Sequence, residues 1–130
     1  MRIFSSAVFV IIVFALSSCE ELLEVRDISG ERMILLAPSD STQVTENNVN
    51  FNWNEIVETT DYRVQVARPS FLEASQIVLD TLVAVDSTYI GPRLTKNLFD
   101  GPYEWRVKAL NSDFETEYTT HSFTVRASSN

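Results

Sequence analysis

A strict alternation of apolar and polar side chains near the end of the chain most constrains how it can fold. Between Tyr103 and Ala109 every second residue is apolar, and the residues between them are Glu104, Arg106 and Lys108. Successive side chains of a β-strand point to opposite faces of a sheet, so a period of two predicts a strand with one buried face. Shorter stretches of the same kind occur at Val49–Trp53 and Tyr62–Ala67.

Seven strands are predicted in all, separated by segments rich in turn-forming residues. Proline and glycine at Pro38, Pro69, Gly91 and Gly101 mark strand ends. The polar stretch 39–48 is predicted to be a loop. Beyond the first 18 residues no segment has a helical period, so we expect an all-β, antiparallel sandwich. The predicted strands are 33–37, 49–53, 62–67, 76–85, 87–90, 103–110 and 118–126.

Composition excludes several classes of protein. A single cysteine cannot form an internal disulfide, and one cysteine with one histidine cannot supply an ordinary zinc site. A net charge of −8 disfavours binding to nucleic acid, because phosphates are repelled. With 45% hydrophobic residues the chain can build a core. We therefore expect a folded domain with no metal and no cofactor.

The first 18 residues are expected to be a cleaved signal peptide rather than part of the fold. Arg2 precedes an apolar stretch, residues 3–16, which is shorter than the roughly 20 residues of a membrane-spanning helix. Leu16-Ser17-Ser18-Cys19 follows and resembles the lipobox of bacterial lipoproteins. The resemblance implies cleavage before Cys19 and acylation of its sulfur, which would tether the protein to a membrane. The alternative is an ordinary signal peptide with an unrelated cysteine.

Residues 19–31 are rich in carboxylates and are expected to form a tether. Five of them are acidic: Glu20, Glu21, Glu24, Asp27 and Glu31. The segment is either a solvated linker or a sorting signal. Cys19-Glu20-Glu21 is similar to the start of surface lipoproteins of the Bacteroidetes type, whereas in other Gram-negative groups an acidic residue there resembles an inner-membrane retention signal. We favour the outer membrane and the cell surface.

Residues 32–126 resemble a fibronectin type III domain, with 127–130 as a polar tail. The resemblance is carried by Trp53, by Tyr62-Arg63-Val64, by Leu98 and the turn at Gly101, and by Tyr103-x-Trp105-x-Val107-x-Ala109. It implies a seven-stranded antiparallel immunoglobulin-like sandwich. It also implies a core containing Trp53, Tyr62, Tyr103, Trp105 and Phe123, and a tyrosine corner in which the Tyr103 hydroxyl bonds nearby backbone.

No catalytic site is predicted. His121 is the only histidine, and no nucleophile motif accompanies it, so a strand residue at the surface is the expected role. Asp113, Glu115 and Glu117 could bind calcium, but their spacing matches no EF-hand, and solvated loop charges are the alternative. The protein is therefore not expected to be an enzyme.

Three apolar loop residues are the candidate partner contacts. Phe71 and Leu72 lie in a predicted loop opposite the tether, where they either cap the sandwich or form an outward patch. Phe114 lies in the loop 111–117, which is expected to face the membrane. The predicted function is a membrane-tethered interaction module that holds an unidentified protein or glycan. The alternative is a structural spacer or subunit of an envelope assembly with no ligand of its own.

Overall fold

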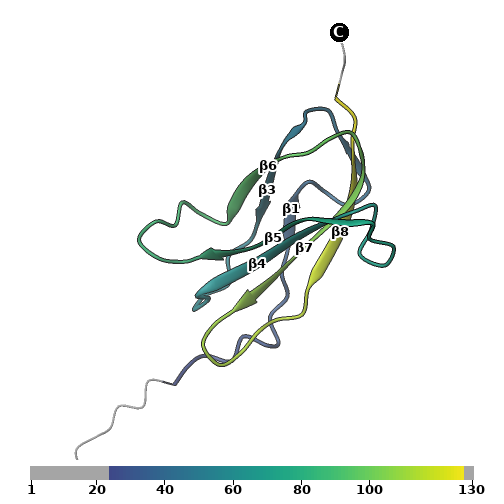
Figure 1. Cartoon of the computed structure of the whole chain (residues 1–130). Helices are drawn as coiled ribbons and strands as arrows, with labels where there is room; N and C mark the ends of the chain where they lie inside the picture. Colours follow the sequence, from purple (N-terminus) through teal and green to yellow (C-terminus); the bar gives the residue numbers. More distant parts are fainter. Residues whose placement is uncertain (1–23, 128–130) are drawn as a thin grey trace, which may run out of the picture.

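The computed structural model describes residues 24–127, and the predicted signal peptide, Cys19 and the tail residues 128–130 lie outside them. Eight strands and no helix occur in the described part (Figure 1). Nothing between residues 24 and 127 is both helical and apolar enough to cross a membrane. The strands are β1 (Leu35–Ala37), β2 (Thr42–Val44), β3 (Asn48–Trp53), β4 (Asp61–Arg68), β5 (Gln76–Ala84), β6 (Arg93–Asn97), β7 (Gly101–Leu110) and β8 (Thr119–Val125).

The strands form a sandwich of two sheets. One sheet has three strands in the order β1-β3-β6, and the other has five in the order β2-β8-β7-β4-β5. The prediction of an all-β sandwich is confirmed, but the prediction of seven antiparallel strands is wrong, because β2 pairs with β8 in parallel. β2 lies in the polar stretch predicted to be a loop. β2 is only three residues long and is joined to the sheet edge by backbone hydrogen bonds, so its sequence shows no alternation of apolar and polar side chains.

A second difference concerns the segment after β5. Residues 87–90, predicted to be a strand, form a turn in which Asp86 Oδ1 accepts a hydrogen bond from Thr88 N at 2.8 Å and Asp86 O accepts one from Tyr89 N at 3.0 Å. The strand is instead β6, which pairs with β3 and places Leu94 opposite Phe51. Leu94 is the only apolar residue of β6, so the pattern that predicts a strand is missing there.

The core lies between the two sheets and is built from the predicted aromatic residues. Trp53, Tyr62, Tyr103, Trp105 and Phe123 are all at most 2% exposed, as predicted. Two of the ring pairs meet edge to face, Phe51 with Trp105 at 5.0 Å and Trp53 with Tyr62 at 5.6 Å between ring centroids. Tyr103 instead stacks on Phe123 at 5.4 Å. Such pairs add to the stabilisation from apolar burial. The inward residues of β3, β4 and β7 therefore hold the two sheets together.

The sandwich has two ends, which we call the near pole and the far pole. The near pole carries the N-terminal segment Arg26–Met33 and the loops 54–60, 85–92 and 111–118. Thr60 N donates to Leu110 O, and Val85 N donates to Thr60 O, so these loops lie together. The far pole carries the loops 69–75 and 98–100. Ala127 N donates to Asp100 Oδ1 there, so the two ends of the described chain lie at opposite poles (Figure 1).

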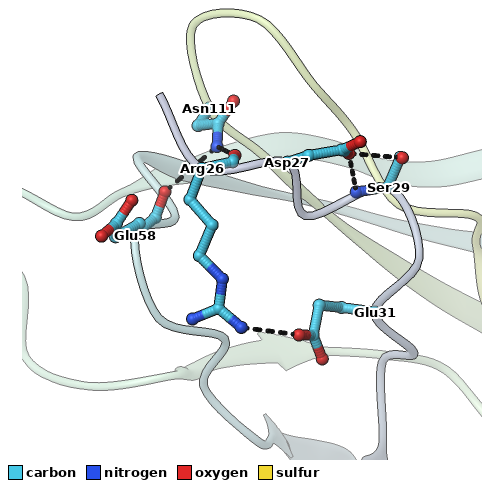
Figure 2. Close-up of polar contacts among 6 residues, drawn as sticks. All are labelled: Arg26, Asp27, Ser29, Glu31, Glu58 and Asn111. Carbon is cyan, nitrogen blue, oxygen red and sulfur yellow. Dashed lines mark hydrogen bonds and ion pairs between the residues drawn. The ribbon is translucent and has the colours of Figure 1, made fainter. Parts of the chain in front are cut away.

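The segment expected to be an acidic tether is partly built into the domain. Ile28 is fully buried in the core cluster. Asn111 Nδ2 donates to Arg26 O at 2.9 Å, and Arg26 Nη2 pairs with Glu31 Oε1 at 2.9 Å (Figure 2). Hydrogen bonds from Ser29 lower the pKa of Asp27. The part of the predicted tether from Arg26 to Glu31 thus contacts the domain, and Ile28 lies in its core.

Candidate functional site

The loop between β4 and β5 holds two neighbouring apolar residues in different environments. Phe71 is half-buried, whereas Leu72 is 93% exposed. Phe71 N donates to Glu104 Oε1 at 2.8 Å, and the Phe71 ring lies 4.0 Å from the guanidinium carbon of Arg106. Of the two predicted contact residues, Phe71 thus packs on the domain and Leu72 points into solvent.

Arg106 fixes this loop to the outer face of the five-stranded sheet. Its guanidinium carbon also lies 4.3 Å from the ring centre of Tyr118, and its Nε donates to Gln65 Oε1 at 2.8 Å. Cation–π contacts of this kind are worth about 0.5–1 kcal/mol each at exposed sites. Arg63 and Lys108 share the face, as predicted, and pair with Asp80 at 2.9 Å and Glu115 at 3.3 Å. Arg106 therefore supports the loop, whereas Arg63 and Lys108 form ion pairs elsewhere on the face.

The second far-pole loop follows β6 and is held by the predicted tyrosine corner. Tyr103 Oη donates to Phe99 O at 2.7 Å, and burial raises the pKa of Tyr103. Leu98 is 3% exposed, and Leu98 N donates to Asn47 O at 2.8 Å. With Leu98 inside and the Phe99 carbonyl held, the Phe99 ring is 81% exposed.

Arg68 joins the two loops at the far pole. Its Nη2 donates to Asp100 O at 3.0 Å, and its guanidinium carbon lies 5.5 Å from the ring centre of Tyr103. Its own carbonyl accepts hydrogen bonds from Ser75 N and Ser75 Oγ, both at 3.0 Å. The end of β4 therefore contacts the start of β5 and the turn before β7.

Leu72 and Phe99, one on each of two far-pole loops, are the candidate contact residues, and we refer to the two together as the far-pole patch. They are the two most exposed large apolar side chains among the described residues. Both are on loops whose backbones are tied down by buried or half-buried neighbours. Sequence reasoning missed Phe99, although the assignment of Leu98 to the core implies that the next residue of an extended chain faces outward.

The other predicted site residues lie elsewhere. Phe114 is half-buried against the core at the near pole, and its N–H donates to Asn111 Oδ1 at 2.9 Å. His121, expected at the surface, lies beside Trp105 with ring centroids 6.5 Å apart, and its buried Nδ1 has no partner among the described residues. Nothing seen in residues 24–127 therefore orients His121 as a general base. The same part of the chain contains no cluster of three metal-ligating side chains, so Asp113, Glu115 and Glu117 are not brought together.

Replacing Gly101 by alanine should loosen the far pole. Gly101 has φ 147°, and an added Cβ would lie 2.8 Å from Arg68 Nη2. We expect a loss of at least about 1 kcal/mol in urea unfolding, because a residue with a side chain is strained at this φ. Gly30→Ala is the matched control, since a Cβ there meets no atom within 4 Å. Equal stability of the two variants would contradict this account of the turn.

Comparisons with known proteins support the fold and leave the family open. No protein-family model matches the chain, and no curated protein matches it. Among solved structures, the crystal structure of CopC from Methylosinus trichosporium OB3b matches with a TM-score of 0.50 and 19% sequence identity. The match covers 76% of this chain and 98% of that chain. A likeness at this identity establishes that the chain is a β-sandwich.

Proposed function

We propose that this protein is a lipid-anchored surface lipoprotein whose fibronectin type III-like domain holds a partner at its far pole. The opposite placement of the N-terminal segment and the far-pole patch carries the proposal. An acyl group on Cys19 would place the near pole toward the membrane. Leu72 and Phe99 would then point away from it, where a partner can reach them.

The short length of chain between Cys19 and Arg26 supports this orientation. Arg26 O is bonded to Asn111 Nδ2, and six residues, 20–25, separate Arg26 from Cys19. Fully extended chain spans at most about 3.3–3.6 Å per residue, so these residues reach about 20 Å. A tether this short keeps the near pole close to the bilayer. The near pole also carries Glu58, Asp61 and Asp113, which anionic headgroups would repel, so this end of the domain would stand slightly off the bilayer surface.

The chemistry of the patch favours a protein partner over a glycan. Leu72 offers no group that can bond sugar hydroxyls, and Phe99 offers only a ring face and edge. Exposed apolar residues held on fixed loops are typical of protein contact sites, because binding then costs little ordering of the loop. The fibronectin type III assignment itself rests on the tyrosine corner and on the buried Trp53, Tyr62 and Trp105.

The double change Leu72→Ser with Phe99→Ser tests the patch. Photo-crosslinking on intact cells should capture a partner with the parent protein and at least about tenfold less with the double variant. The melting temperature should stay within a few degrees, because both side chains are exposed. By contrast, Phe71→Ser should lower stability, since Phe71 packs on Arg106.

Val57→Ser with Ile90→Ser is the matched control. These two side chains are 66% and 71% exposed on near-pole loops, so the change removes comparable apolar surface from the other end. It should leave capture unchanged. If both double variants capture equally, the patch is not the contact, and a spacer without a ligand becomes the better interpretation.

A further inference from the structure

The outer strand of the five-stranded sheet is open along one side. β5 is the last strand in the sheet, and in the described part of the chain it pairs only with β4. An edge strand presents a row of unpaired backbone N–H and C=O groups that another extended chain can bond. At nine residues, β5 is long for an edge strand.

β5 carries few of the features that usually protect an edge. It contains no proline or lysine, and its one register shift lies opposite Val66 and Ala67. Asp80 is its only charged residue, and Arg63 holds both carboxylate oxygens at 3.0 Å and 2.9 Å. From Leu79 to Ala84 the strand keeps a regular antiparallel register with β4. This part of β5 can therefore accept a further strand.

A groove beside the start of β5 indicates what kind of chain would bind. Gln76 and Val78 of β5 form one wall, and Lys96 and Asn97 of β6 form the other. Lys96 leaves β6 on the same face as Leu94, which packs toward the core, so Lys96 reaches the gap between the sheets. Phe99, Leu98, Tyr103 and Arg68 complete the lining.

The charged side chains of this groove are opposite in sign to the net charge of the protein. Its only charged side chains, Arg68 and Lys96, are both cationic, whereas the chain has a net charge of −8. Arg68 uses Nη2 on Asp100 O, and a guanidinium has further N–H donors for a carboxylate. Two copies of this chain, each with a net charge of −8, would repel each other as whole molecules, which disfavours self-pairing.

We propose that β5 binds an extended acidic segment of a partner protein by strand addition, with a partner carboxylate in the groove between Arg68 and Lys96. The inference deepens the proposed function, because it names the chemistry of the partner. Backbone bonds to β5 would supply affinity, and the groove would select the acidic side chain. The site adjoins the far-pole patch through Phe99 but does not include Leu72.

The test uses the full chain and a fluorescent peptide of about six alternating valine and glutamate residues, a usual strand length. Fluorescence anisotropy at low salt should show this peptide binding at least about tenfold tighter than its lysine counterpart. Lys96→Glu should weaken binding at least about tenfold. Arg93→Glu makes the same charge change on β6 outside the groove and should alter binding less than about twofold. Hydrogen exchange should slow at backbone amides of β5.

Several results would overturn the inference. The first is that the glutamate and lysine peptides bind equally well. The second is that Lys96→Glu binds the glutamate peptide as tightly as the parent, and the third is that hydrogen exchange slows on a strand other than β5. Protection of β5 in the protein alone, with a dimer in sedimentation, would assign the edge to a second copy. Leu72→Ser should leave peptide binding intact. If Leu72→Ser abolishes partner capture on cells and Lys96→Glu does not, the proposed function stands and strand addition is wrong.

Discussion

Replacing Trp105 by alanine should destabilise the folded protein by about 3–5 kcal/mol, as truncation of large core aromatics does. Trp105 is fully buried, and its ring meets Phe51 edge to face at 5.0 Å. Its Nε1 donates to Pro38 O at 3.1 Å, so it also ties β7 to the chain after β1. Alanine leaves a cavity between the sheets and an unbonded buried carbonyl. Urea unfolding monitored by circular dichroism measures the loss.

Trp105→Phe separates packing from hydrogen bonding. Phenylalanine keeps most of the ring but cannot donate to Pro38 O, so we expect a smaller loss, in which the unpaired carbonyl costs about 1–3 kcal/mol. Leu82→Ala, on the outer face of β5 with 57% of the side chain exposed, is the surface control and should cost little. A Trp105→Ala variant as stable as the Leu82→Ala variant would mean that β7 does not face the core.

The strands that could be predicted are those with one face in the core. β3, β4, β7 and β8 alternate because their inward residues, such as Phe51, Val64, Val107 and Phe123, pack between the sheets. β2 and β6 are short and mostly polar, and backbone pairing with β8 and β3 holds them. Backbone hydrogen bonds use the same N–H and C=O groups whatever the side chain, so a strand held mainly by them shows no pattern in the sequence.

The site was only partly predictable for a related reason. The sequence places Phe71 and Leu72 together in a loop, but it does not say which side chain points outward. That depends on Arg106 and Glu104, which are on β7 and more than 30 positions away in sequence. In the same way, the burial of Ile28 goes with a hydrogen bond from Asn111 Nδ2, in a distant loop, to Arg26 O. Long-range contacts of this kind need the fold first.

Cys19→Ala should abolish acylation completely. Metabolic labelling with an alkyne fatty acid is expected to tag the parent chain and to leave the variant unlabelled, because the sulfur that would carry the lipid is gone. Cys19 is the only cysteine in the chain, so no other thiol can substitute. Ser18→Ala is the matched control: it keeps a small residue before the cysteine and should be labelled like the parent. Equal labelling of parent and Cys19→Ala would exclude the lipoprotein assignment.

Because Cys19 is the only cysteine of the chain, an introduced cysteine can report which pole of the domain faces the membrane. In an acylated protein Cys19 carries lipid, so a cysteine introduced by Leu72→Cys would be the only free thiol. A membrane-impermeant maleimide should label Leu72→Cys on intact cells. Val57→Cys, at the near pole within about 20 Å of the bilayer by the tether length, should react more slowly. Labelling of both variants only after cell lysis would place the domain on the inner side of the outer membrane, away from the cell exterior. That result would contradict surface exposure. Faster labelling of Val57→Cys would reverse the proposed orientation, because the far-pole patch would then be the end nearer the lipid.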